Sequence, residues 1–193
     1  MKQMKIRETN LADCFILEPD RYGDNRGYFS PFFIANNLKE LGFGDVVQAN
    51  RSKSGKGVLR GMHYQLDPKC QSKIVEVING KALDVVVDLR YDSPTYCDWT
   101  SVLLTPDNNR QLFVPKGFAH GFLSLEDDTV FQYLIDNDYE PSMEGGIPYN
   151  DPAIGIQWDL MFKEYDIQDV NLSDKDVNRE RFVKTRKLFK RNK

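Results

Sequence analysis

Histidine is scarce in this sequence, which contains only His63 and His120 among its 193 residues. A metal site in a hydrolase or a β-barrel enzyme usually draws two or three imidazoles and a carboxylate. Both histidines would be needed for such a site, and neither belongs to a His-x-His or His-Glu-x-x-His pattern. We therefore expect no catalytic metal.

Cysteines are few, and long apolar runs are absent. Cys14, Cys70 and Cys97 are odd in number and far apart, a usage typical of reduced, cytoplasmic proteins. We expect each to fill apolar space, with Cys70 the one that could be exposed. No stretch approaches the ~20 apolar residues of a spanning helix, and the first residues lack the apolar region of a signal peptide. We expect a cytoplasmic protein with no membrane partner.

An excess of charge of either sign is also missing. The chain has 26 basic and 29 acidic residues, a net charge of −3, which argues against a dedicated nucleic-acid binder. A small anionic ligand needs only a local cluster of Arg and Lys and stays possible. With 12% aromatic residues and no low-complexity linker, residues 1–193 are expected to fold as a single domain.

Most of the chain consists of short apolar runs separated by turn residues, the pattern of an antiparallel sandwich or barrel. The Asn79-Gly80 dipeptide is a strong hairpin signal, so the two runs that flank it are expected to pair with each other. Residues 31–41 are expected to form a short N-terminal helix that ends at Gly42. The strands are expected at residues 14–17, 72–78, 81–89, 100–104, 111–114, 121–125 and 129–135.

The C-terminal part is expected to be helical from Ser173. Ser173 suits the N-cap position, and Asp176 suits the third helical position, where a carboxylate is favourable to the helix dipole. The last ten residues carry six cations, and we expect them to form a solvated basic tail from about residue 184.

Three segments are unusually rich in polar residues for strands that should form a core. In residues 57–65, strand alternation places Arg60 and Met62 on one face and Gly61 and His63 on the other, with Gly61 leaving room beside His63. His120 follows a Pro-Lys-Gly turn, and Tyr133 lies inside the strand at 129–135.

These residues also have ordinary structural explanations. A lone histidine in a strand is more often a core or rim residue than a catalyst. Tyr133 could simply pack with its hydroxyl bonded, and Arg60 and Lys73 could be surface charges.

Nine segments, taken together and in order, carry a resemblance to a known family. They are residues 24–29 (DNRGYF), 48–50 (QAN), 58–65 (VLRGMHYQ), 71–73 (QSK), 84–90 (DVVVDLR), 93–96 (SPTY), 115–122 (PKGFAHGF), 150–152 (NDP) and 172–176 (LSDKD). From about residue 12 to about residue 178 the chain closely resembles the dTDP-4-dehydrorhamnose 3,5-epimerases, which are metal-free cupin enzymes. The Leu-Arg-Gly-x-His and Pro-x-Gly-Phe-Ala-His-Gly-Phe motifs are specific.

The resemblance implies an all-β fold, a double-stranded β-helix (a cupin or jelly-roll barrel) with a short N-terminal helix and C-terminal helices. It implies a homodimer that epimerises dTDP-4-dehydro-6-deoxy-D-glucose at C3 and C5. No cofactor is expected, because C4 of the substrate is already oxidised.

Each site residue follows from the same resemblance. His63 resembles the general base, Asp176 the carboxylate that orients it, Tyr133 the general acid, and Lys73 the cation beside the C4 oxygen. These types suit the reaction, because a proton next to a ketone requires a placed base and a stabilised enolate oxygen. The positions that resemble substrate-binding residues are Arg26, Gln48, Asn50, Arg60, His120, Tyr139, Glu144 and Lys175. Arg26 is expected to come from the partner subunit.

Two positions depart from the family pattern. Pro31 stands where the family commonly has a glutamate of the nucleotide pocket, and Ala49 replaces a frequent aspartate. Three alternatives stay open: a relative that acts at C3 only or on another nucleotide, a non-catalytic cupin that binds a nucleotide sugar, and a metal-dependent cupin.

Overall fold

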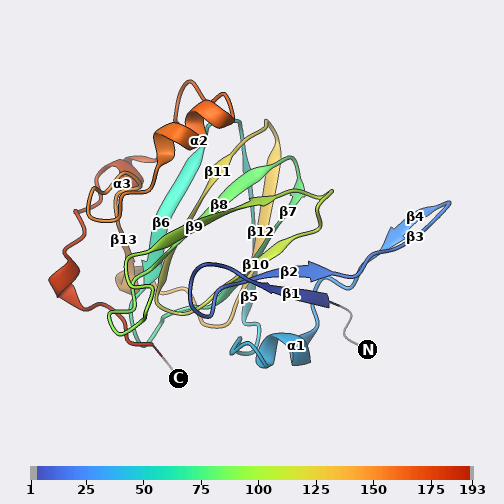
Figure 1. Ribbon diagram of the computed structural model, residues 1–193, viewed down its shortest axis with the longest axis horizontal. Helices are drawn as coiled ribbons and strands as arrows, with labels where there is room; N and C mark the ends of the chain where they lie inside the picture. The colour runs from blue at the N-terminus through green and yellow to red at the C-terminus, as the bar shows by residue number, and fades with distance from the viewer. Residues whose placement is uncertain (1–3, 192–193) are drawn as a thin grey trace.

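A computed structural model describes residues 4–191 of the chain and shows two antiparallel sheets that face each other (Figure 1). In spatial order, one sheet contains β1 (Met4–Glu8), β2 (Phe15–Pro19), β10 (Gln111–Val114), β7 (Lys73–Asn79), β12 (Thr129–Ile135) and β5 (Gln48–Ser54). The other contains β13 (Glu144–Gly146), β6 (Leu59–Gln65), β11 (Phe118–Ser124), β8 (Ala82–Asp88) and β9 (Trp99–Leu104). A separate hairpin, β3 (Tyr22–Asp24) and β4 (Gly27–Phe29), projects from the body.

Side chains of both sheets fill the space between them. Val75 and Phe131 from the six-stranded sheet meet Val86 and Phe122 from the five-stranded sheet in one buried cluster. The rings of Phe122 and Phe131 stack across the interior, with centroids 4.1 Å apart. Two antiparallel sheets closed over a common core form the expected double-stranded β-helix, so the prediction of the fold class is confirmed.

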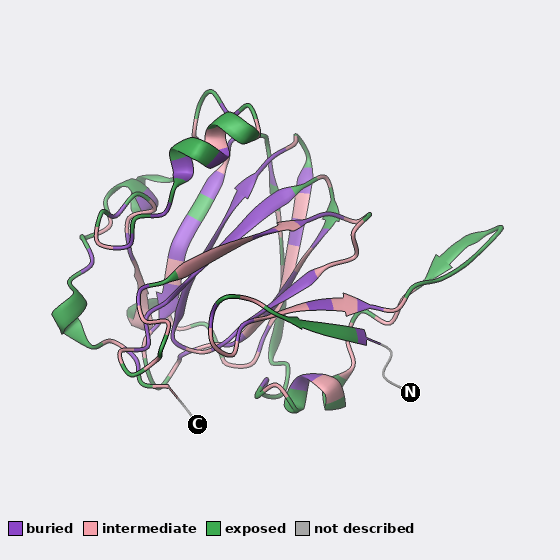
Figure 2. Ribbon diagram, in the orientation of Figure 1, coloured by how far each residue is buried: buried purple, intermediate pink, exposed green. Residues whose placement is uncertain are grey.

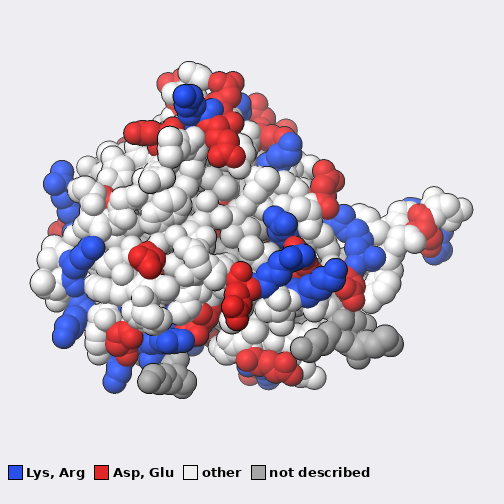
Figure 3. Space-filling view, viewed as in Figure 1, with Lys and Arg blue, Asp and Glu red and all other residues white. Residues whose placement is uncertain are grey.

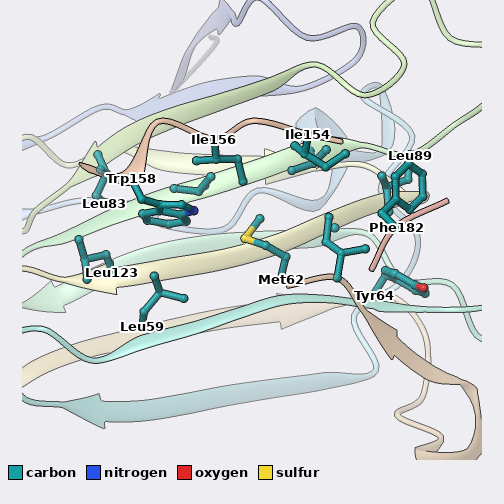
Figure 4. Close-up of a cluster of buried hydrophobic side chains, with 14 of the residues drawn as sticks. Leu59, Met62, Tyr64, Leu83, Leu89, Leu123, Ile154, Ile156, Trp158 and Phe182 are labelled. Carbon is teal, nitrogen blue, oxygen red and sulfur yellow. The ribbon is translucent and has the colours of Figure 1, made fainter. Parts of the chain in front are cut away.

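The outer face of the five-stranded sheet is buried as well. Leu59 and Leu83 on this face lie near Trp158, which begins α2 (Trp158–Glu164), and Phe182 from further along the chain lies beside Leu89 in the same buried cluster (Figure 4). Strand β8 is therefore buried on both faces, while β3 and β4 are exposed along their whole length (Figure 2). Helix α2 was not expected from the sequence.

The predicted hairpin at Asn79-Gly80 is wrong. Strand β7 pairs with β10 and β12, whereas β8 pairs with β11 and β9 in the other sheet. Gly80 adopts a φ of 75°, and a Cβ there would lie 2.5 Å from the hydroxyl oxygen of Thr129. The turn therefore carries the chain from one sheet to the other, and β7 and β8 each pair with other strands.

The expected alternation along β6 is also wrong. His120 of β11 lies opposite His63 and Phe122 lies opposite Arg60, so between these pairs one residue on β11 faces two on β6. This irregularity brings Arg60 and His63 to the same side and leaves Met62 fully buried in the outer cluster. The space beside Gly61 is taken by β11, since a Cβ on Gly61 would lie 2.6 Å from the Cα of Gly121.

The helices are shorter than expected. Helix α1 spans Ala35–Lys39, because Phe33 packs into an apolar cluster before the helix begins. Helix α3 begins after Ser173 as expected but spans only Asp174–Val177. The chain beyond α3 extends to bury Phe182, and 3₁₀ turns at Pro141–Met143 and Lys184–Arg186 complete the helical structure of residues 4–191.

The expected basic tail is exposed at residues 184–187, but the expectation of a solvated tail is wrong where Phe189 and Arg191 dock on the body. Phe189 is 2% exposed and packs its ring edge-on against Tyr64, with centroids 5.3 Å apart. The Arg191 guanidinium donates two hydrogen bonds of 2.8 Å to the Asp13 carboxylate near the other end of the chain. Residues 192 and 193 of the tail lie outside the described residues.

All three cysteines are free and buried, including Cys70, which the sequence left open to exposure. Its sulfur accepts a hydrogen bond of 3.1 Å from the main-chain nitrogen of Gly117. Burial raises the pKa of the Cys70 thiol to about 11 and that of Cys14 to about 12, so both remain protonated at neutral pH. These residues are apolar filling, as predicted.

Candidate active site

Two adjoining cavities of about 580 and 330 Å³ bring the predicted site residues together. All twelve except Arg26 line one cavity or both. The larger is lined by Asn50, Arg60, His63, Lys73, His120 and Tyr133, and by α3 through Lys175 and Asp176. The smaller adds Gln48, Tyr139 and Glu144.

His63 and Asp176 form a hydrogen-bonded pair at the wall of the larger cavity. The Nε2 of His63 lies 2.5 Å from the Oδ1 of Asp176, which is 4% exposed. Ser173 caps α3 by accepting a bond from the main-chain nitrogen of Asp176, and this cap holds the carboxylate toward β6. Burial acts to raise the pKa of Asp176, but the bonds from His63 and Ser173 outweigh it and hold that pKa below its usual value.

A second buried chain of polar groups runs from Lys73 through His120 to Asp84. The Nε2 of His120 lies 2.7 Å from the Oδ1 of Asp84, and its Nδ1 lies 3.5 Å from the Nζ of Lys73. Burial lowers the pKa of His120, so the neutral ring donates to Asp84 and offers a lone pair to Lys73. Asp84 thereby supplies the negative charge for the lysine, and burial lowers the pKa of Lys73 to about 8.

Tyr133 lies on β12, in the sheet opposite the one that carries His63. It packs beside Phe131, and the Nζ of Lys73 is 5.9 Å from the centre of its ring. Burial raises the pKa of the phenol, so the hydroxyl stays protonated at neutral pH and can donate a proton. The cavity thus has a basic nitrogen on one wall and an acidic hydroxyl on the other.

Glu144 is the centre of a polar cluster in the smaller cavity. Its carboxylate accepts hydrogen bonds from the Tyr139 hydroxyl at 2.6 Å, the Lys175 ammonium at 2.6 Å and the Arg179 guanidinium at 2.8 Å. Although burial acts to raise the pKa of Glu144, these donors lower it to about 2. Glu144 is therefore an anion that two cations and one hydroxyl hold in place.

Arg60 is held over the larger cavity, with its Nε donating to the Ser54 hydroxyl at 3.2 Å. Gln48 and Asn50 follow each other along β5, and the Gln48 amide donates to the Asn50 side chain at 2.5 Å. Asn50 lies directly opposite Tyr133 in the strand register. Arg60 therefore places a positive charge, and Gln48 and Asn50 place amide groups, in the cavities near Tyr133.

Arg26 is the predicted site residue that the fold does not bring to the cavities. It lies at the turn of the β3–β4 hairpin, where its guanidinium pairs with Asp24 at 2.5 Å. The hairpin projects away from the barrel, with charged atoms near its tip (Figures 1 and 3).

Sequence reasoning missed two residues of this region, Asp84 and Arg179. Asp84 is fully buried in β8, and a carboxylate inside an apolar strand could have indicated a role. Arg179 carried no comparable signal, because only the path of the chain after α3 places it beside Glu144. Within residues 4–191, no group of three or more His, Cys, Asp or Glu side chains is arranged to hold a metal ion.

Comparison with known proteins is consistent across sequence and structure. Residues 8–184 match the family model described as dTDP-4-dehydrorhamnose 3,5-epimerase. The curated dTDP-4-dehydrorhamnose 3,5-epimerase of Shigella flexneri is 43% identical over 182 residues, covering 93% of this chain and 97% of that protein.

Solved structures give the same result. The crystal structure of dTDP-6-deoxy-D-glucose-3,5-epimerase from Legionella pneumophila, in complex with dTDP-4-keto-L-rhamnose, is 40% identical with a TM-score of 0.89. The match covers 98% of this chain and 100% of that one. A more distant structure is a 3′-monoepimerase from Streptomyces bikiniensis in complex with dTDP-quinovose, 32% identical with a TM-score of 0.81, covering 91% of this chain and 86% of that one.

Proposed function

The chain belongs to the dTDP-4-dehydrorhamnose 3,5-epimerase family, and from this premise we propose how its cavity inverts C3 and C5 of dTDP-4-dehydro-6-deoxy-D-glucose. The observation that carries the proposal is the placement of His63 and Tyr133 on opposite sheets around one cavity. Inversion requires that a proton leaves one face of the sugar ring and returns on the other. Groups on facing walls can serve the two faces.

His63 removes the proton next to the ketone. Because Nε2 is bonded to the Asp176 carboxylate, that nitrogen carries the hydrogen and Nδ1 keeps the free lone pair. The C–H bond breaks, its electron pair moves toward the C4 oxygen to form an enolate, and the proton goes to Nδ1. Asp176 then stabilises the imidazolium that forms.

Lys73 stabilises the negative charge on the enolate oxygen. It is partly buried and lies within the cavity, where a cation acts more strongly than it would in water. The neutral His120 and the Asp84 carboxylate behind it keep a balancing charge close by. No redox step is involved, since the substrate enters and leaves as a ketone.

Tyr133 returns a proton to the carbon on the opposite face. Its hydroxyl donates the proton as the enolate collapses to the ketone, and the phenolate regains one from solvent while His63 releases its own. The same pair serves the second carbon after the sugar shifts in the cavity. Burial keeps the pKa of Tyr133 above its usual value, which favours the protonated donor before each turnover.

The nucleotide part occupies the region between Arg60 and the Glu144 cluster. Arg60 and Lys175 provide the positive charge that a diphosphate requires. The Tyr139 ring is half exposed in the smaller cavity and offers a stacking surface for the base. Gln48 and Asn50 add amide hydrogen bonds beside Tyr133.

The functional unit is a homodimer in which the β3–β4 hairpin supplies Arg26 to the other subunit. The hairpin exposes Tyr28 and Phe29, which are 61% and 68% exposed, and Phe32 nearby is 50% exposed. Apolar rings gathered on one projection favour a covering partner. The site of action is the cytoplasm, as the three free cysteines favour. Within residues 4–191, no helix is long and apolar enough to cross a membrane.

An enzyme that inverts only C3 is the nearest alternative, because one structural relative is a 3′-monoepimerase. Incubation with substrate in heavy water, followed by proton NMR, separates the two reactions. We expect deuterium at both C3 and C5 with the wild type and at neither with His63→Ala, which should still bind dTDP within a few-fold. Deuterium at C3 alone would favour the alternative, and several per cent of residual turnover in His63→Ala would remove the proposed base.

A further inference from the structure

Arg179 links the Glu144 cluster to the His63–Asp176 pair. Its Nη2 donates to the Oε1 of Glu144 at 2.8 Å, and its Nε lies 3.8 Å from the Oδ1 of Asp176. That Oδ1 is the same oxygen that bonds His63. One guanidinium therefore lies between the carboxylate of the smaller cavity and the carboxylate that supports the base.

The position of the guanidinium is constrained by its surroundings. The Arg179 side chain is 12% exposed, and its Nε is buried with no hydrogen-bond acceptor among residues 4–191. A Cβ on Gly146 would lie 2.8 Å from that Nε and 2.9 Å from the Cζ, so the glycine in β13 leaves the space that the guanidinium occupies. An arginine that is this little exposed and held this closely acts as a fixed charge rather than a mobile surface one.

Glu144 has hydrogen-bond donors other than Arg179. For Asp176, Arg179 is the only Lys or Arg within 4 Å among the residues described. Lys175 and Tyr139 already bond the Glu144 carboxylate. Part of the charge of Arg179 is therefore available to Asp176, which carries the negative charge that His63 needs when it accepts a proton. The arginine lowers the cost of keeping Asp176 ionised and holds its Oδ1 toward His63.

We propose that Arg179 is a positioning residue for the epimerase reaction, anchored by Glu144 and acting on the base through Asp176. This inference rests on the proposed function, in which His63 is the base. Arg179 also connects the two cavities. A ligand that displaces Glu144 in the smaller cavity would displace Arg179, and with it the cation beside Asp176.

A loss of one cation beside the dyad changes the dependence of the rate on pH. In Arg179→Met, we expect kcat at the optimum to fall roughly 3- to 30-fold while KM stays within about twofold, since Arg179 acts through another residue. We expect the acid limb of log(kcat/KM) to move to higher pH, because protonation of the dyad no longer meets the repulsion of the arginine. The other charged or titratable groups that line the cavities with the dyad are Arg51 on β5, Arg60 and Tyr64 on β6, Lys73 on β7, His120 on β11, Tyr133 on β12, Tyr139 before β13, Glu144 on β13 and Lys175 on α3.

Two matched variants make the test specific. Arg179→Lys keeps the charge but cannot reach both carboxylates with a planar fork, so its acid limb should match the wild type while kcat recovers only in part. Arg181→Met removes an exposed arginine two residues away and should change neither quantity. An unmoved acid limb in Arg179→Met, with or without a lower melting temperature, would overturn the inference and leave a purely structural arginine.

A spectroscopic measurement separates this inference from the proposed function. The proton shared by His63 and Asp176 should give a downfield NMR signal, which His63→Asn would assign in a chain with two histidines. We expect the signal to shift or broaden in Arg179→Met and not in Arg181→Met. A changed signal without any change in kcat or in the acid limb would show the contact and overturn the inference that it acts on the reaction, whereas residual turnover in His63→Ala tests the base itself. An unchanged signal would overturn the role of Arg179.

Discussion

The Nε2 of His63 lies 2.5 Å from the Oδ1 of Asp176, although 113 residues separate them in the chain. His63 is on a strand of the barrel, and Asp176 is in the first turn of a four-residue helix capped by Ser173. The cap bond uses the main-chain nitrogen of Asp176, while the bond to His63 uses its side chain. The two roles of Asp176 can therefore be separated by mutation.

Asp176→Asn should lower kcat by roughly 10²–10⁴-fold, because an amide neither stabilises the imidazolium nor fixes the tautomer. The fold should persist, since the Ser173 cap is retained, and the loss of a favourable helix charge costs at most about 1 kcal/mol of unfolding free energy. Steady-state kinetics and urea unfolding measure the two effects. Ser173→Ala is the control: it should cost about 1 kcal/mol of stability with a much smaller loss of rate. Equal rate losses in both variants would contradict the separate roles.

The rate should fall as the pH rises through about 8, where the partly buried Lys73 loses its proton. The sign follows from the role, because the charged form below that pH stabilises the enolate oxygen and the neutral form above it does not. Tyr133 also has to be protonated, but burial raises its pKa from an ordinary value of 10, so its limb lies at higher pH. A pH profile of kcat tests this prediction. In Lys73→Arg, any residual activity should not fall near pH 8, because the arginine stays charged. A fall in rate that persists near pH 8 in this variant would assign the titration to another group.

Tyr133→Phe should separate proton removal from inversion. The base is untouched, so deuterium should still enter the substrate, while net inversion should fall because the acid on the opposite wall is missing. Proton NMR of the sugar in heavy water measures both rates in one sample. Tyr139→Phe is the matched control, since its hydroxyl bonds Glu144 and should affect dTDP affinity more than inversion. Exchange and inversion lost in equal measure in Tyr133→Phe would mean that Tyr133 does more than return the proton.

Phe189→Ala should destabilise the protein by about 3–5 kcal/mol, the cost of emptying a buried aromatic site. The Phe189 ring lies against the ring of Tyr64. The Cβ of Phe189 also packs against Gly117, where an added Cβ would lie only 3.0 Å from it. Urea unfolding with an unchanged m-value would measure this loss. Leu188→Ala, at the partly buried neighbouring position, should cost less. A variant as stable as the wild type would show that the C-terminal segment is not docked in solution.

Local pattern was enough for the individual strands. The bounds of β10 and β12 agree with the predicted strands. Apolar residues that alternate or run continuously between turn residues indicate which side chains are buried, and so where a strand lies. The same pattern could not say which strands pair. Asn79-Gly80 has the composition of a hairpin, yet β7 and β8 belong to different sheets, because β7 pairs with β10 and β12, which lie more than 30 residues away.

The sequence by itself determined the family, through motifs that contain His63, His120 and Asp176, and with it the expected barrel and the set of residues around the cavities. Only the tertiary structure decided how these residues face one another. An irregularity opposite Gly121 moved Arg60 and His63 to one side of β6, and the chain after α3 carried Arg179 to Glu144 and Phe189 to Tyr64. The physical reason is that side-chain direction and long-range contact depend on strand register and packing, which a local pattern does not encode.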